Sequence, residues 1–237
     1  MVNLLIVDDN MSYAISLMNY INKNNADVRV CNIAVNGKDA IDILNNSQKN
    51  IDIILLDLKL PLFNGKKILQ QIKHKEKYKK SFIIISGELN FINELYEDEM
   101  VYTIINKLYG LKEIEKKVDE LVENKKEDKT KEKIMKEILY LNYDISNIGT
   151  IYLIEAIKYI VLKMPNKEFN NLKGEIYPII AERHKDTIHN IKSNIERANN
   201  IMYCRCEMNR LLEYFNYIED TKPNIKTVII TIINKIS

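Results

Sequence analysis

The segment DIILLDLKLP, which runs from Asp52 to Pro61, decides the fold of the first half of the chain. In it four large apolar residues, Ile53 to Leu56, come directly before a carboxylate, Asp57. Such an apolar run is typical of a strand buried on both faces, as in a parallel sheet covered by helices. A lone Asp after a strand is most often a turn cap, but the carboxyl edge of an open α/β sheet is also where ligands bind. Other acidic residues decide between these interpretations.

Strand and helix patterns alternate on both sides of this segment. The expected strands are Leu4–Val7, Val28–Ala34, Ile51–Leu56, Phe82–Ile85 and Val101–Ile105. The expected helices are Ser12–Lys23, Lys38–Leu44, Lys66–Lys73, Asn90–Tyr96 and Leu111–Val122. Because parallel strands joined by helices form right-handed crossovers, this order predicts an α/β fold with a doubly wound, five-stranded parallel sheet.

Composition and charge indicate two domains. The chain has 237 residues, enough for two domains of ordinary size. Residues 1–123 contain 16 basic and 18 acidic residues, whereas residues 124–237 contain 19 basic and 15 acidic residues. Between the halves, ENKKEDKTKEK (Glu123–Lys133) has no apolar anchor, which is typical of a linker or an exposed helix end. We therefore expect a domain at 1–123, a linker at 124–130 and a second domain at 131–237.

Three features of the sequence indicate a cytoplasmic protein that does not enter a membrane. The first residues enter a strand pattern directly, without a signal peptide. No apolar run approaches the length of a membrane span. The chain has three cysteines, an odd number without a disulfide pattern, which is typical of a reducing compartment.

Polar side chains of complementary type follow the predicted strands. Asp8 and Asp9 come after the first strand, Asp57 ends the third, Ser86 ends the fourth and Lys107 follows the fifth. In one parallel sheet all of these ends lie at the same edge. Three carboxylates there would repel one another unless a hard cation lies among them, and carboxylate oxygens suit Mg²⁺. A hydroxyl and an ammonium opposite the cation can bind a phosphoryl group.

The motifs VDDN, LLDLKLPLFNG and IISG, with the Lys after the fifth strand, closely resemble the receiver domain of two-component response regulators over roughly residues 1–122. The resemblance implies a flavodoxin-like fold in which Asp57 is the phosphoacceptor and attacks a phosphohistidine donor. It also implies that Ser86 and Lys107 bind the phosphoryl oxygens. The implied ligands of Mg²⁺, or of another divalent cation such as Ca²⁺ or Mn²⁺, are Asp8, Asp9, Asp57 and the backbone carbonyl of Lys59.

Two residues depart from the receiver pattern. Leu108 stands where the family usually has Pro after the conserved Lys, and Ile104 stands where it often has Tyr or Phe. Because the acidic residues are intact, we expect normal phosphorylation. We expect a weaker coupling of phosphorylation to dimerisation.

The second half of the chain has helical patterns. A helix is expected at Lys131–Leu141. It is followed by a helical apolar stripe that contains Ile148, Leu153, Ile154, Ile157, Ile160 and Val161. Pro178 suits the first turn of a helix that ends near His184. After a short turn at Lys185-Asp186, Thr187 is a suitable N-cap of the next helix, so this region is a helix-turn-helix candidate.

The second helix of this candidate has two different faces. Its apolar face contains Ile188, Ile191, Ile195, Ala198 and Met202, and its polar face contains His189, Asn190, Ser193, Glu196, Arg197 and Asn200. Small polar residues with one Arg suit a helix in the major groove of DNA. A plain amphipathic surface helix has the same pattern. The candidate DNA contacts are Lys185, Thr187, His189, Asn190, Lys192, Ser193, Glu196 and Arg197.

The segments YDISNIGTIYLIEAI, IYPIIAERH, NIERA and EDTKPNIKTVI resemble the C-terminal DNA-binding domain of the stage-zero sporulation response regulators of endospore formers. This resemblance covers about residues 131–237. It implies a helix-turn-helix at Ile176–Asn199 and a final helix at Ile225–Ile236. The polar face has less arginine than the family has, which leaves open whether the chain controls sporulation or, as a paralogue, other genes.

We therefore expect a phosphorylation-controlled DNA-binding transcription regulator, the response regulator of a two-component phosphorelay, with sporulation initiation as one role. Its expected partners are DNA, a histidine kinase or phosphotransferase, a second copy of the chain after phosphorylation, and RNA polymerase. The alternative is a receiver-controlled helical module that binds protein or RNA. An enzyme is least favoured, because the second half offers no nucleophile–base pair and no metal cluster.

Overall fold

The computed structural model describes the chain apart from residues 47, 49, 88–92, 165–170 and 217–221. The described residues form two compact units, 1–124 and 125–237, and each unit has hydrophobic core clusters of its own. Within this described part, no helix combines the length and the apolar character that a membrane span requires.

A five-stranded parallel sheet is the framework of unit 1–124. Its strands are β1 (Val2–Val7), β2 (Val28–Ala34), β3 (Ile53–Asp57), β4 (Phe82–Ser86) and β5 (Val101–Asn106). They lie in the order β2-β1-β3-β4-β5, and every adjacent pair is parallel. The strand order changes direction between β1 and β3, as in a doubly wound sheet. The predicted α/β fold is therefore confirmed.

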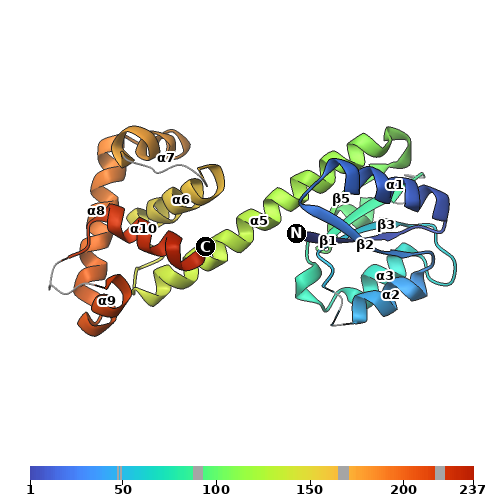
Figure 1. Cartoon of the computed structure of the whole chain (residues 1–237), viewed down its shortest axis with the longest axis horizontal. Coiled ribbons are helices and arrows are strands. Elements are labelled where there is room, and N and C mark those ends of the chain that lie inside the picture. The colour runs from blue at the N-terminus through green and yellow to red at the C-terminus, as the bar shows by residue number, and fades with distance from the viewer. Residues whose placement is uncertain (47, 49, 88–92, 165–170, 217–221) are drawn as a thin grey trace. The chain divides into compact units, whose positions relative to one another are not determined.

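Helices cover both faces of this sheet (Figure 1). The first part of α5 (Leu111–Tyr140) and α1 (Met11–Asn24) lie on one face, and α2 (Gly37–Asn45), α3 (Gly65–Ile72) and α4 (Asn93–Tyr96) lie on the other. Two short 3₁₀ helices, η1 (Glu76–Tyr78) and η2 (Lys107–Tyr109), complete the unit. The predicted start of the fourth helix at Asn90 lies outside the described residues.

The position of β3 explains its apolar sequence. Ile53 and Leu55 belong to the core cluster under α1 and α5, whereas Ile54 and Leu56 belong to the cluster under α2 and α3. All four side chains are at most 1% exposed. A strand buried on both faces has no polar position until its end, so Asp57 is the first residue of β3 that can take part in chemistry.

Asparagines begin three α-helices of unit 1–124. Asn10, Asn36 and Asn64 are the N-caps of α1, α2 and α3, and each side chain accepts a hydrogen bond from the backbone N–H three residues later. Gly37 follows Asn36 because a Cβ at this position would lie 2.0 Å from the carbonyl oxygen of Phe63. These caps fix the loops that follow β1, β2 and β3 at the carboxyl edge of the sheet.

α5 is one helix of 30 residues. The sequence predicted separate helices at Leu111–Val122 and Lys131–Leu141, and the interruption between them is not present. The residues between are mostly Glu and Lys, which favour helices, and they include no Gly or Pro. A helix that is polar all round can connect two domains. Residues 124–130 are therefore helical, and their role as the linker between two domains stays a prediction.

The described residues of unit 125–237 after α5 are helical, with connecting turns. The elements are α6 (Ile148–Lys163), a π-helical turn η3 (Leu172–Ile176), α7 (Tyr177–His184), α8 (Ile188–Arg205), α9 (Met208–Phe215) and α10 (Ile225–Ile236). α6 packs closely against α8 at Gly149, where a Cβ would lie 2.0 Å from the carbonyl oxygen of Asn194. The predicted stripe of α6 faces the core except for Ile148, which is 42% exposed because it begins the helix.

Candidate functional site

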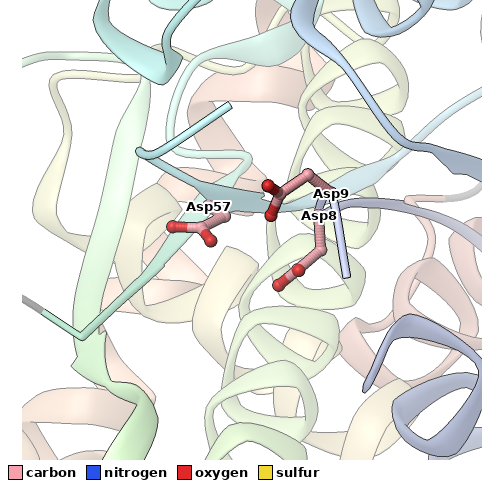
Figure 2. A group of neighbouring side chains, drawn as sticks. All are labelled: Asp8, Asp9 and Asp57. Carbon is pink, nitrogen blue, oxygen red and sulfur yellow. The ribbon is translucent and has the colours of Figure 1, made fainter. Parts of the chain in front are cut away.

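Three carboxylates lie together at the carboxyl edge of the sheet (Figure 2). Asp8 and Asp9 follow β1, and Asp57 is the last residue of β3, the strand beside it. One oxygen of each side chain lies within 4.8 Å of the others. Asp8 and Asp57 are buried, whereas Asp9 is exposed. This edge of the sheet therefore carries three carboxylates, of which two are shielded from water.

Lys107 follows β5 directly and pairs with two of these carboxylates. Its Nζ lies 2.7 Å from Asp8 Oδ2 and 2.6 Å from Asp57 Oδ2. Burial alone would lower the pKa of the Lys107 ammonium, but the hydrogen bonds to Asp57 and Asp8 outweigh it, and the pKa is raised. Lys107 is therefore a firmly charged group between the two buried carboxylates.

Burial has the opposite effect on Asp57. It raises the pKa of the Asp57 carboxyl, and the hydrogen bonds from Lys107 and from the backbone N–H of Lys59, at 3.2 Å, offset only part of the shift. The backbone N–H of Asn10 donates to Asp8 Oδ1 at 2.9 Å. These bonds hold both carboxylates in place from the loops after β1 and β3.

This set of donors fits a hard divalent cation. Three carboxylates face one ammonium, so the group keeps an excess of negative charge. Its oxygen ligands are the kind that Mg²⁺ prefers, and the exposed Asp9 leaves room for the waters that Mg²⁺ retains. Ca²⁺ and Mn²⁺ accept the same oxygen ligands. The backbone carbonyl of Lys59 stays a predicted ligand.

Ser86 reaches the same edge of the sheet. It is the last residue of β4, is 3% exposed and pairs in register with Asn106, the residue before Lys107. On its other side β4 pairs with β3, the strand that ends in Asp57. The structure thus brings the five predicted residues of the acidic site to adjacent strand ends, and their individual roles stay predictions.

Tyr13 is a neighbour of this site that the sequence interpretation did not include. It lies in the first turn of α1, and the Nζ of Lys107 lies 5.0 Å from the centre of its ring. The sequence feature that could have identified Tyr13 is an aromatic residue four positions after Asp9, in a helix that begins next to the acidic residues. That signal was weak because an aromatic residue in an amphipathic helix is usually a core residue.

The helix-turn-helix region has the predicted start and turn. α7 ends at His184, Lys185 takes a left-handed conformation with φ 52°, and the Thr187 side chain accepts a hydrogen bond from the N–H of Asn190. Asp186 accepts hydrogen bonds from the Thr187 backbone N–H at 2.7 Å and from the Asn190 side chain at 2.8 Å. The bond from Asn190 is the first cause of a lowered pKa for the Asp186 carboxyl. The turn is therefore closed by its own side chains.

The candidate DNA contacts are exposed apart from Ser193, which is half-buried. Four of them already have partners within the chain. Thr187 and Asn190 bond to each other and to Asp186, and Lys192 lies 3.5 Å from Glu196. The opposite face of α8 is buried as predicted at Ile191, Ile195, Ala198 and Met202. Ile188 is the exception in burial: it is 37% exposed, because it is the first residue of the helix.

Two family models match the chain. The response regulator receiver domain matches residues 4–119, and the sporulation initiation factor Spo0A C-terminal domain matches residues 132–236. The two matches include both the acidic site and the helix-turn-helix region.

Solved structures of receiver domains are similar to part of the chain. A CheY-like receiver domain protein from Methanospirillum hungatei is 23% identical and covers 54% of this chain and 98% of its own, with a TM-score of 0.45. A receiver domain protein from Clostridium thermocellum is 20% identical and covers 53% and 98%, with a TM-score of 0.45. The response regulator TrrA from Thermotoga maritima, solved with Mg²⁺ and BeF, is 21% identical and covers 51% and 99%, with a TM-score of 0.43.

Proposed function

The chain belongs to the response regulators, with a receiver domain followed by a domain of the Spo0A C-terminal family, and on this premise we propose that Asp57 is its phosphoacceptor. These two domains make it a phosphorylation-controlled, DNA-binding transcription regulator. The observation that supports the proposal for Asp57 is the group of three carboxylates with Lys107 at one sheet edge. Asp57 is the carboxylate of this group that a buried strand holds rigidly.

In the proposed reaction, an oxygen of Asp57 attacks the phosphorus of a phosphohistidine on a histidine kinase or phosphotransferase. A P–O bond forms as the P–N bond breaks, and the imidazole nitrogen keeps the electron pair. Lys107 favours the ionised nucleophile through its bond to Asp57 Oδ2. After the transfer, the Lys107 ammonium leaves Asp57 Oδ2 and binds the phosphoryl group. The Ser86 hydroxyl also donates a hydrogen bond to this group.

The carboxylates at this sheet edge form the proposed cation site. Asp8, Asp9 and Asp57 would bind Mg²⁺ or a similar divalent cation, with the backbone carbonyl of Lys59 as a further ligand. When bound, the cation screens the negative charge that develops on the phosphoryl oxygens. The Asn10 backbone N–H and Lys107 both bond to Asp8, so its oxygens are oriented.

The helical unit carries the output. We propose that phosphorylation promotes dimerisation through the receiver, so that two helix-turn-helix regions bind adjacent half-sites on DNA in the cytoplasm and contact RNA polymerase. We propose that the regulated process is sporulation initiation. The alternative within this proposal is that the chain is a paralogue of the sporulation regulator and controls other genes. The match to the Spo0A C-terminal model does not favour a module that binds protein or RNA.

Different residues of α8 have different proposed contacts with DNA. Arg197 is exposed and makes no ion pair with another described residue, so it is free to approach base edges, with Ser193 beside it. Lys185 in the turn and Lys192 on the flank would contact phosphates. Asn190 already bonds to Asp186, so its first role is to close the turn. His189, Thr187 and Glu196 complete the proposed surface.

A DNA-binding titration with and without phosphorylation tests this account. Genomic fragments and scrambled duplexes would be titrated at several salt concentrations with the full chain and two variants. Arg197→Ala should cost about 1–3 kcal/mol on the specific site and relax preference at one base position, because a bidentate guanine contact is worth about that much. Lys192→Ala should weaken all duplexes and lower the salt slope by about one unit, because it removes one phosphate contact.

Two results of the titration would contradict the proposal. If Arg197→Ala weakened specific and scrambled duplexes equally, α8 would be an electrostatic surface and not a reader of bases. If neither variant changed binding, the DNA-contact assignment would be wrong, and a protein or RNA partner would take its place.

A further inference from the structure

Tyr13, whose ring neighbours Lys107 of the acidic site, has a buried hydroxyl. The hydroxyl oxygen is closed off from solvent, and it has no hydrogen-bond partner among the described residues. The backbone N–H of Tyr13 is bonded to the side chain of Asn10, the N-cap of α1, at 3.1 Å. The position of the residue is therefore fixed by the loop that also carries Asp8 and Asp9. A buried polar group without a partner is rare enough to need an explanation.

The ring of Tyr13 already contacts the site through Lys107. The ammonium lies over the ring, 5.0 Å from its centre, while the same ammonium is bonded to Asp8 and Asp57. A cation over an aromatic face is attracted by the ring, and the attraction is stronger where water is excluded. The ring therefore helps to hold Lys107 on the side of the carboxylates.

The chemical state of the phenol suits a hydrogen-bond donor. Burial, above all, raises the pKa of Tyr13; the charge of Lys107 lowers it, and the charges of Asp8 and Asp57 raise it. The hydroxyl is thus neutral and keeps its proton at physiological pH.

We propose that Tyr13 is a phosphoryl-binding residue whose ring supports Lys107 and whose hydroxyl donates a hydrogen bond to the phosphoryl group carried by Asp57. This inference rests on the proposed phosphorylation of Asp57. A buried hydroxyl without a partner among the described residues costs stability, and a phosphoryl oxygen that accepted its hydrogen bond would remove that cost. Tyr13 therefore favours the phosphorylated state over the unphosphorylated one.

The test measures the binding of a phosphoryl mimic. Beryllium trifluoride, with Mg²⁺ present, would be titrated into the full chain by calorimetry, and urea unfolding would be measured without it. Tyr13→Phe keeps the ring and removes the hydroxyl, so it should weaken binding about tenfold, with unfolding stability unchanged or raised. Tyr13→Leu also removes the ring under Lys107 and should weaken binding further.

Tyr20→Phe is the matched control. Tyr20 lies on the same helix, seven residues beyond Tyr13, where burial and the Glu115 carboxylate raise the pKa of its hydroxyl. This variant should bind the mimic as the wild type does. An equal loss in Tyr20→Phe and Tyr13→Phe would overturn the inference, because the effect would then belong to α1 as a whole.

Other outcomes separate the inference from the function on which it rests. If the wild type failed to bind beryllium trifluoride, the proposed phosphorylation site would fail and the inference with it. If the wild type bound and Tyr13→Phe bound equally well, the inference alone would be overturned. A fall in unfolding stability of Tyr13→Phe that matched its loss of binding would overturn it too, since the hydroxyl would then be structural.

Discussion

Asn199 makes a strong test of how α8 is held in the helical unit. Its side chain is 2% exposed, accepts a hydrogen bond from the Tyr143 hydroxyl at 2.8 Å and donates one to the Pro223 carbonyl at 2.8 Å. Tyr143 precedes α6 and Pro223 precedes α10. One buried amide therefore connects α8 to the segments that begin two other helices.

The cost of removing this amide follows from its two bonds. Asn199→Ala would leave the Tyr143 hydroxyl and the Pro223 carbonyl buried without partners, and each unsatisfied group costs about 1–3 kcal/mol. The free energy of unfolding should therefore fall by about 2–6 kcal/mol. Tyr143→Phe removes only one of the bonds and should cost about 1–2 kcal/mol. The double variant should cost less than the sum, because the two single variants remove one shared bond.

Urea unfolding of the full chain, followed by circular dichroism, would give these free energies. Hydrogen exchange of α8 would show that the transition belongs to unit 125–237, since a chain with two units need not unfold in one step. A cost below about 1 kcal/mol for Asn199→Ala, or additive effects of the two substitutions, would refute the reasoning. Under conditions where Asn199→Ala stays folded, its affinity for DNA should be unchanged, because the side chain does not reach the surface.

Two further predictions concern packing and charge. Gly149→Ala should cost about 1–3 kcal/mol in the same unfolding experiment, because the added methyl would meet the Asn194 carbonyl oxygen at 2.0 Å and push α6 from α8. Gly87→Ala, whose Cβ would meet no described atom within 4 Å, is the control. The raised pKa of Asp57 means that the folded chain holds this proton more tightly than the unfolded chain. Without divalent cations, the free energy of unfolding of unit 1–124 should therefore fall as pH rises from about 4 through the folded pKa of Asp57. Urea unfolding between about pH 4 and pH 8 would measure this fall, and Asp57→Asn should remove the part that Asp57 causes. A fall in Asp57→Asn as large as in the wild type would refute this prediction.

The sequence contains most of the receiver fold because the fold depends on short-range patterns. Ile53 to Leu56 of β3 are all apolar, and a short apolar run without interruption is typical of a strand in the middle of a sheet covered by helices on both faces. The meeting of Asp8, Asp57 and Lys107 also follows from topology, because the ends of parallel strands share one edge. Which oxygens Lys107 binds could not be predicted, since side-chain conformation depends on the burial and charges around it.

Other features could not be predicted because they depend on tertiary contacts, or on whether a helix continues through a segment without a helix-breaking residue. The break predicted before Lys131 is not present, because a charged segment of Glu and Lys can continue a helix as easily as it can form a linker. Asn190 was predicted to contact DNA, and only the folded turn shows that it bonds to Asp186. Tyr13 has no local pattern that separates it from a core residue. Its place at the site depends on the contact with Lys107, far away in the sequence.

The most direct measurement of the central claim is the intact mass of the protein after treatment with a small phosphodonor and Mg²⁺. The account predicts one added phosphoryl group on the wild type and none on Asp57→Asn, because the amide nitrogen cannot replace the nucleophilic carboxylate. Asp52→Asn is the matched control, since Asp52 also lies on the β3 segment but at its other end, where it accepts a hydrogen bond from the Asn3 backbone N–H. It should take up the phosphoryl group normally. The same added mass on Asp57→Asn as on the wild type would contradict the account.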